Sequence, residues 1–282
     1  MIRILADSTC DLPKELLSEY NIDIIPLQIL LGDREYEDGC GVTPAELFRW
    51  SDENKATPKT AACRQETAMA ALEKHISAGD EVICFTISEH MSCTANVIRM
   101  AAQALEASDR VTVVDSASLS TGNGLLVVHA AEMAQLGATC AEIVKAVEDM
   151  KPRVRASFVV DTLTYLHRGG RCSGVAALLG GTLRLHPCIS VVNGKMEPGK
   201  KYRGKMSRVI ASYVEDIMPA LLKADPKRVF ITHAACSDEI VQSICDRVRA
   251  LNRFEEIIVT EAGCVISSHC GPGTLGVLFV DA

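Results

Sequence analysis

Short apolar runs alternate with longer amphipathic stretches through the first half of the chain. The short runs are rich in Val and Ile, which favours strands, and the longer stretches repeat apolar residues every three or four positions, which favours helices. The predicted strands are 2–6, 22–31, 81–87 and 111–114, and the predicted helices are 92–105, 118–136 and 139–151. Strands that alternate with helices are typical of parallel βαβ units.

Two further helices are predicted from the residues that open them. Thr43 is followed by a proline and, three residues on, by Glu46, which is the pattern of a capping box. Asp11 lies two residues before Pro13, so we expect a second helix with Asp11 as its N-cap and the proline in its first turn. The first half is therefore expected to be a mainly parallel sheet flanked by helices.

The pattern changes after Pro152. Two strands, 185–193 and 195–203, are predicted to form a hairpin, because Asn193-Gly194 between them is a strong two-residue turn sequence. The other predicted elements are strands 155–160, 228–233 and 255–261, and helices 162–166, 173–179, 237–251 and one that ends near 223. A hairpin within an alternating pattern predicts a mixed sheet. We expect an α/β protein of two domains, 1–153 and 154–282, the second of α+β character.

Composition and charge narrow the possible functions. The 282 residues are 48% apolar with a net charge of −7, so the chain can bury a full core but offers no basic face to nucleic acid. Residues 1–9 resemble a strand and turn more than a secretion signal, and no apolar run approaches the ~18 residues of a membrane span. The twelve cysteines contain no CxxC pair. We therefore expect a cytoplasmic protein without a metal or cofactor site.

Hydroxyl side chains follow several of the predicted strands. Ser8 and Thr9 follow the first strand, Ser92 and Thr94 follow strand 81–87, and Ser116 follows the next. Ligands of open α/β sheets bind beyond the carboxyl ends of the strands, where hydroxyl groups could bind a carboxylate. Serine and threonine at these positions are also the usual N-caps of the following helix. For Ser8, Thr9 and Ser116 this local role is the alternative interpretation.

A histidine opens a glycine-proline-glycine segment near the end of the chain. Gly271 and Gly273 let the backbone approach a ligand closely, and the proline between them favours the first position of a helix. His269 beside free backbone N–H groups would suit an anion. The alternative is a structural histidine bonded to a carbonyl. The segment also matches GxGxxG by letter, but six residues follow Gly276, so we expect no dinucleotide fold here.

Several motifs together resemble the DegV family of bacterial fatty-acid-binding proteins. They are Asp7-Ser-Thr-Cys-Asp-Leu12, Asp115-Ser116, Thr162-Leu-Thr-Tyr-Leu-His-Arg-Gly-Gly-Arg-Cys-Ser173, Pro187-Cys-Ile and His269-Cys-Gly-Pro-Gly. The resemblance runs in order from residue 2 to 281. It implies an α/β N-terminal domain, a second α/β domain with a mixed sheet, and a lipid tunnel between them.

The resemblance also implies a carrier rather than a catalyst. Members similar to the binding subunit of bacterial fatty acid kinase hold a long-chain acid, and a separate kinase subunit phosphorylates its carboxylate for phospholipid synthesis. Carried over by motif, the carboxylate would be bound by Thr60, Ser92, Thr94, His269 and Arg171. Residues that would surround this group are Ser8, Thr9, Ser116, Gly271 and Gly273.

Two loops depart from the family pattern. Thr60-Ala61-Ala62-Cys63 stands where the family has Thr-Ser-Gln-Pro, which removes one hydroxyl. Cys93, between Ser92 and Thr94, stands where the family has glycine, which leaves less space for the carboxylate. We expect head-group affinity or ligand identity to differ from other members. The apolar segment 173–185 is a candidate wall of the tunnel.

Two other functions remain as alternatives. A serine-dependent lipid hydrolase would use the same hydroxyls and histidine, but the chain has no GxSxG nucleophile motif. A lipid-responsive module could instead regulate a partner without phosphorylation.

Residues 195–208 carry six cations, among them Arg203 and Lys205, against one glutamate. We expect this hairpin to dock an acidic partner such as the kinase, the alternative being lysines that keep a sheet edge from aggregating.

Overall fold

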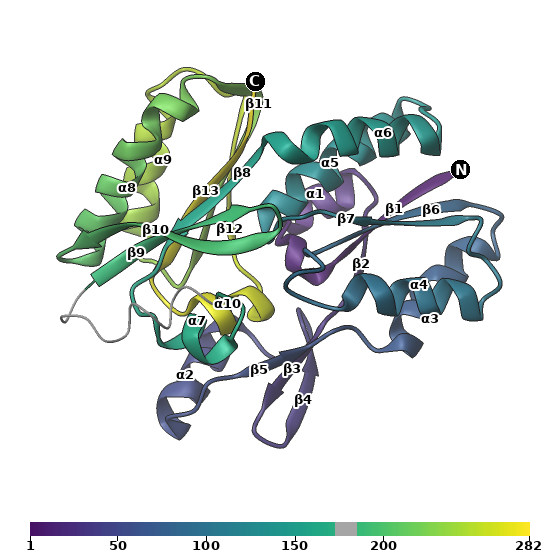
Figure 1. The fold of residues 1–282 in the computed structure, drawn as a ribbon, viewed down its shortest axis with the longest axis horizontal. Coiled ribbons are helices and arrows are strands. Elements are labelled where there is room, and N and C mark those ends of the chain that lie inside the picture. The colour runs from purple at the N-terminus through teal and green to yellow at the C-terminus, as the bar shows by residue number, and fades with distance from the viewer. Residues whose placement is uncertain (173–184) are drawn as a thin grey trace.

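The computed structural model describes residues 1–172 and 185–282 (Figure 1). Its first sheet has four parallel strands in the order β2-β1-β6-β7. These strands are β1 (Ile2–Asp7), β2 (Asp23–Ile25), β6 (Glu81–Thr86) and β7 (Val111–Asp115). The helices on its two faces are α1 (Lys14–Glu19), α3 (Gln65–Ile76), α4 (Thr94–Ala104), α5 (Thr121–Gln135) and α6 (Cys140–Met150). The parallel sheet expected for the first half is confirmed.

Helices on both faces explain why the first sheet's strands are continuous apolar runs. Leu5 of β1 packs in a core with residues of α3 and α4, whereas its neighbours Ile4 and Ala6 pack in another core with α5. Successive side chains of a strand point to opposite faces, so both kinds of position must be apolar here.

The second sheet has six strands in the order β10-β9-β8-β13-β11-β12. They are β8 (Val154–Val159), β9 (Leu185–Val192), β10 (Lys195–Arg203), β11 (Ala224–Ala234), β12 (Glu256–Glu261) and β13 (Thr274–Asp281). Only the β11–β12 pair is parallel, so the predicted mixed sheet is confirmed. α8 (Met206–Leu221) and α9 (Asp238–Arg249) cover one face.

Helix α5 lies between the two large sheets. Leu125 and Leu126 share a core with Ile83 and Phe85 of the first sheet and with Phe230 of the second. Ten of the fifteen residues of α5 are buried. A helix that is apolar on all sides is stable only when it is covered on all sides, and here the two sheets do this.

A small third sheet and three short helices complete the described fold (Figure 1). The sheet is antiparallel and contains β3 (Gln28–Leu31), β4 (Arg34–Glu37) and β5 (Lys59–Ala61). The helices beside it are α2 (Pro44–Asn54), α7 (Thr164–Gly169) and α10 (Cys264–Cys270). Two 3₁₀ turns cover Ser8–Cys10 and Lys151–Arg153. The capping box at Thr43 is confirmed, with Glu46 bonding back to the Thr43 backbone.

Three predicted elements differ from the structure. The single run 22–31 is split into β2 and β3, in different sheets, by Pro26, which has no N–H to donate to a ladder. The short helix predicted at 162–166 begins later, at Thr164, and ends where Gly170 takes a left-handed conformation with φ of 68°. Helix 173–179 and most of the candidate wall 173–185 lie outside the described residues.

Asp11 is not the N-cap of α1. Pro13 occupies that position, and Asp11 ends the preceding 3₁₀ turn in a left-handed conformation with φ of 50°. Its carboxyl group instead accepts a hydrogen bond of 2.8 Å from the backbone N–H of Gly263. A tertiary partner 252 residues away thus replaces the local capping role expected from sequence.

The predicted hairpin turn is confirmed and touches the first half of the chain. Asn193 and Gly194 both have positive φ, as a type I′ turn requires. The Ser88 hydroxyl donates to the Gly194 carbonyl at 2.7 Å. A Cβ on Gly194 would lie 2.6 Å from that hydroxyl oxygen, so only glycine fits this approach.

Tyr213 offers a test of packing in the second sheet. Its buried hydroxyl donates to the Ser157 carbonyl at 2.7 Å and accepts from the Val277 N–H at 3.1 Å. Tyr213→Phe should therefore lower the free energy of unfolding by about 1–3 kcal/mol, because buried backbone groups lose a partner. Urea denaturation measures this. Tyr36→Phe is the matched control, since the Tyr36 hydroxyl makes no hydrogen bond within the described residues; equal effects of both changes would contradict the argument.

Candidate functional site

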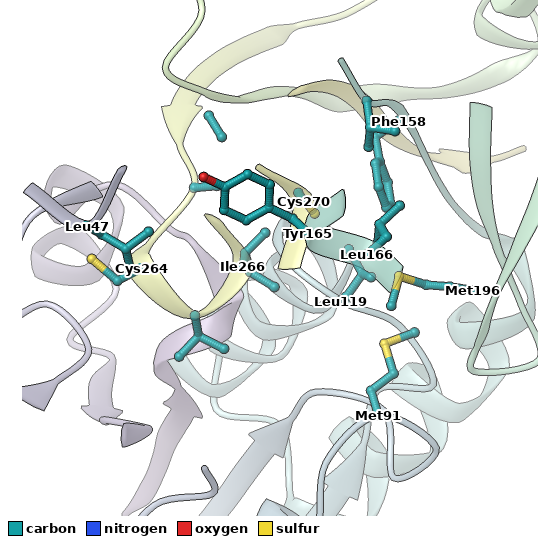
Figure 2. Close-up of a cluster of buried hydrophobic side chains, with 14 of the residues drawn as sticks. Leu47, Met91, Leu119, Phe158, Tyr165, Leu166, Met196, Cys264, Ile266 and Cys270 are labelled. Carbon is teal, nitrogen blue, oxygen red and sulfur yellow. The ribbon is translucent and has the colours of Figure 1, made fainter. Parts of the chain in front are cut away.

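A cavity of about 220 Å³ lies between α10, β5, the start of α4 and the hairpin β9–β10. Most of its wall is apolar, and its polar side chains are Thr60, Ser92, His269 and Arg171. The apolar wall residues are Leu27, Ala61, Ala62, Ile87, Met91, Leu119, Met196, Val265 and Ile266. Figure 2 shows Met91 and Met196 pointing toward one another beside Leu119. The cavity therefore has an apolar body with a small polar group on its wall.

His269 and Thr60 come together from the last turn of α10 and from β5. The Thr60 hydroxyl and His269 Nε2 are 2.8 Å apart. On the other side of the ring, a Cβ on Gly169 would lie 2.3 Å from His269 Nδ1. Only a residue without a side chain lets α7 approach the histidine this closely. Thr60 and Gly169 thus fix the ring from both sides.

Burial holds His269 in the neutral form. Desolvation, followed by repulsion from Arg171, lowers the pKa of His269 to about 4. Its Nδ1 is buried without a hydrogen-bond partner among the described residues. A neutral ring offers one N–H and one lone pair, so His269 can orient an anionic group by hydrogen bonding but does not supply its counter-charge.

Arg171 is the one cation among the described residues that line the cavity. Its Nη1 donates to the Gly169 carbonyl at 2.7 Å and its Nε approaches the Met91 carbonyl at 3.4 Å. These bonds orient the guanidinium with two of its five N–H groups. The remaining N–H groups are suited to a carboxylate or phosphate, which Arg can bind with two parallel hydrogen bonds.

Ser92 and Thr94 form a hydroxyl pair at the start of α4. Their oxygens are 2.9 Å apart, and Ser92 Oγ also accepts from the Thr94 N–H at 3.3 Å. Ser92 lines the cavity, whereas Thr94 is buried behind it. Four of the five residues expected at the carboxylate therefore line one cavity, and Thr94 contacts it through Ser92.

The residues expected around this group lie elsewhere. Ser8 accepts from the Leu27 N–H at 3.1 Å, Thr9 donates to Asp7 at 2.6 Å, and Ser116 bonds the backbone of Ser118. None of these three hydroxyls lines the cavity. None of the three caps a helix, because the N-cap positions are taken by Asp7, Pro13 and Ser120, so the capping alternative is wrong as well. Thr9 and Ser116 instead stabilise turns that follow strands.

The segment after His269 does not open a helix. α10 ends at Cys270, and Pro272 lies in the turn before β13. Gly271 and Gly273 have φ of 77° and 76°, and the Gly273 N–H donates to the Ala234 carbonyl at 2.7 Å. The expected helix N-terminus with free N–H groups is therefore wrong, because the histidine lies in the last turn of a helix. The two glycines shape the turn and lie outside the cavity lining.

No sequence pattern indicated the residues of this apolar wall or the close approach of Gly169 to His269. Val265, Ile266 and His269 share one face of α10, a spacing that is typical of any amphipathic helix. Met91 and Met196 come from segments about a hundred residues apart. No local pattern distinguishes such residues from ordinary core, so only their assembly around one cavity identifies them.

Comparison with known proteins agrees with this geometry. A family model for DegV, described as uncharacterised proteins, matches residues 1–282. The chain belongs to the DegV family. A DegV domain-containing protein of Deinococcus radiodurans is 32% identical over 98% of this chain and 97% of its own length. None of the helices in the described part of this DegV protein is long and apolar enough to cross a bilayer.

Solved structures of other DegV proteins have the same fold. One from Thermus thermophilus, described by its fatty acid binding, has a TM-score of 0.90 and 30% identity over 100% of this chain and 99% of its own. DegV from Bacillus subtilis, described as a fatty acid binding protein, has a TM-score of 0.83 and 28% identity over 100% and 99%. The arrangement of a parallel and a mixed sheet is thus the DegV fold.

The protonation of His269 can be tested directly. We expect its ring protons to titrate with a midpoint near pH 4, below the ~6.5 of an unperturbed histidine. Because the folded state favours the neutral ring, the resulting stabilisation is complete above pH ~6.5 and is lost as the pH falls toward 4. NMR titration measures the midpoint, with His269→Gln used to assign the resonance. A midpoint near 6.5 would contradict the burial argument.

Proposed function

We propose that this DegV protein binds a long-chain fatty acid, with the carboxylate at Thr60, Ser92, His269 and Arg171. The observation that carries the proposal is the neutral His269, bonded to Thr60 at 2.8 Å and near Arg171, on the wall of a mostly apolar cavity. Thr94 supports Ser92 from behind. The fatty acid binding described for the proteins from Thermus thermophilus and Bacillus subtilis supports the same ligand class.

The acyl chain supplies most of the binding free energy in this proposal. Burying about fourteen methylenes at ~0.8 kcal/mol each gives ~11 kcal/mol before association and ordering costs. A carboxylate buried without partners would cost several kcal/mol. The polar group therefore serves chiefly to avoid that penalty and to set the orientation of the acid.

A second, smaller cavity supports a tunnel for the chain. It has a volume of about 20 Å³ and shares Leu119, Ile266 and Cys270 with the first cavity (Figure 2). From there it continues to Phe158 and Gly276 of the mixed sheet. An acyl chain that starts at His269 would follow this path between the sheets. Small movements of the three shared side chains would join the two spaces.

The hydroxyl partners favour a carrier over a hydrolase. A serine nucleophile needs a histidine base within hydrogen-bond reach. The hydrogen-bonding partner of Ser92 is Thr94, and that of His269 is Thr60. The serine candidate and the histidine are thus bonded to other groups, which suits carboxylate binding better than ester hydrolysis. Ester turnover abolished by Ser92→Ala would overturn this preference.

Presentation of the carboxylate to a kinase extends the proposal. Cys93 and Arg171 at the polar end of the cavity are exposed, so a carboxylate there would face the surface. A fatty acid kinase subunit could then transfer phosphate from ATP to form an acyl-phosphate for phospholipid synthesis. A lipid-responsive regulator would bind the acid equally well without this reaction. Acyl-phosphate formation with a candidate kinase subunit separates the two functions.

Thr60 gives the most direct mutational test of ligand binding. Thr60→Val keeps the shape of the side chain and removes its hydroxyl, so oleate affinity should fall about ten- to hundredfold, the equivalent of ~1.5–3 kcal/mol for a hydrogen bond to a charged group. Displacement of a fluorescent fatty acid measures the affinity. Thr112→Val, in strand β7 away from the cavity, should leave the oleate affinity unchanged.

Mass spectrometry of the molecules released on denaturation should find a stoichiometric long-chain acid. A protein that neither carries nor takes up such an acid would refute the proposal.

The hairpin end is proposed as the docking surface for the acidic partner. Arg203 and Lys205 are exposed and form no ion pair within the described residues, whereas Lys200 is bonded to Asp216 at 2.6 Å. Reversing both charges, Arg203→Glu with Lys205→Glu, should lower the rate of kinase-coupled acyl-phosphate formation several-fold and leave oleate affinity unchanged. An unchanged rate would instead favour the alternative, in which the lysines of the hairpin keep a sheet edge from aggregating.

A further inference from the structure

Two buried carboxyl groups from the first half of the chain hold the beginning of α10. Asp11 Oδ1 accepts from the Gly263 N–H at 2.8 Å, and Asp38 Oδ1 accepts from the Cys264 N–H at 2.8 Å. Both side chains surround Gly263 closely, since a Cβ there would lie 3.2 Å from Asp11 and 3.3 Å from Asp38. These are the first N–H groups of the helix whose last turn carries His269.

Further contacts fix Asp11 itself. Its backbone carbonyl accepts from the Thr260 hydroxyl at 2.8 Å, and its Oδ2 is hydrogen-bonded to Ser120 Oγ. Ser120 precedes α5 with the unusual backbone angles φ 50° and ψ −143°, and it also lines the second cavity. A strained residue of this kind persists only where its surroundings hold it. Asp11 thus connects α10, β12 and the start of α5.

The surroundings of this group favour uncharged carboxyls. Burial, with a contribution from the neighbouring Asp38 and Asp7, raises the pKa of Asp11 to about 8. Burial likewise raises the pKa of Asp7 to about 6 and that of Asp38. The titratable side chains that face the group from the adjoining elements are Asp7, Cys10, Asp38, Glu46, Glu261, Cys264 and Cys270. This set contains carboxyls and thiols and no cation.

We propose that Asp11 and Asp38 are positioning residues for the carboxylate site. Neither residue lines the cavity; they act by fixing the start of α10, and thereby the place of Ile266 and His269 on its later turns. Asp11 Oδ1 accepts from the Gly263 N–H, and its Oδ2 accepts from the Ser120 hydroxyl. Ionisation of Asp11 adds a negative charge beside Asp38 and Asp7, which weakens the hold on the helix. The inference rests on the fatty-acid function proposed above.

Oleate affinity at pH 7.0 and 8.5 tests the role of the proton. A group with a pKa of about 8 is mostly protonated at pH 7.0 and about one quarter protonated at pH 8.5. The wild-type affinity should therefore fall about fourfold relative to Asp11→Asn, which keeps an acceptor for the Gly263 N–H and cannot ionise. Taking the ratio of the two proteins at each pH cancels changes in free oleate. His269, with its pKa near 4, does not change its protonation state between pH 7.0 and 8.5.

Two further variants separate positioning from general stability. Asp11→Ala and Asp38→Ala remove the acceptors and should bind oleate about two- to tenfold more weakly than the corresponding asparagine variants at pH 7.0. Asp109→Asn, an exposed carboxylate in a surface turn, is the matched control and should follow the wild type at both pH values. Asparagine variants that restore the affinity lost in the alanine variants support positioning through the hydrogen bond.

The amide resonance of Gly263 reports the proton without any ligand. It should move between pH 7.0 and 8.5 in the wild type and stay constant in Asp11→Asn. An identical pH dependence of oleate affinity in both proteins, or alanine variants that bind as tightly as the asparagine variants, would overturn the positioning role. Wild-type protein that binds no oleate at either pH refutes the proposed function and the role with it. The two failures are thus distinguishable.

Discussion

Helix α5 imposes the constraint on which the rest of this structure depends. Ten of its fifteen residues are buried, so it is stable only when other elements cover most of its surface. The parallel sheet covers one side and the mixed sheet another, and Leu125 and Leu126 belong to a core that both sheets share. The two halves of the chain are therefore held against each other, and Leu119, just before the helix, reaches the cavity beside them.

Helix α10 connects this packing to the proposed binding site. Although it comes from the end of the chain, both of its ends are held by the beginning: Asp11 and Asp38 at its start, and Thr60 at His269. A two-turn helix has little stability of its own, so its position follows from these contacts. The face with Val265, Ile266 and His269 then forms part of the cavity wall. Within the DegV fold, a few hydrogen bonds to α10 thus determine where His269 lies.

In the proposed function, the polar group binds an anion with Arg171 as the one charged side chain among the described residues that line the cavity. Burial keeps His269 neutral, and Arg171, nearer the surface, supplies the positive charge. An arginine at the surface avoids most of the desolvation cost that a buried cation would bring. In such a site the apolar wall determines affinity, and the hydrogen-bonding groups determine which end of the ligand faces outward.

Local patterns in the sequence determined the α/β class, the parallel and mixed sheets, the capping box at Thr43 and the hairpin turn at Asn193-Gly194, since each depends on residues close together in the chain. Motifs also indicated Thr60, Ser92, Arg171 and His269. Only the tertiary structure decided that the two parts of the apolar run on either side of Pro26 join different sheets, that α10 contains the histidine in its last turn, and that Asp11 binds Gly263 rather than capping α1. These depend on partners up to 252 residues apart, whose energies no local pattern contains.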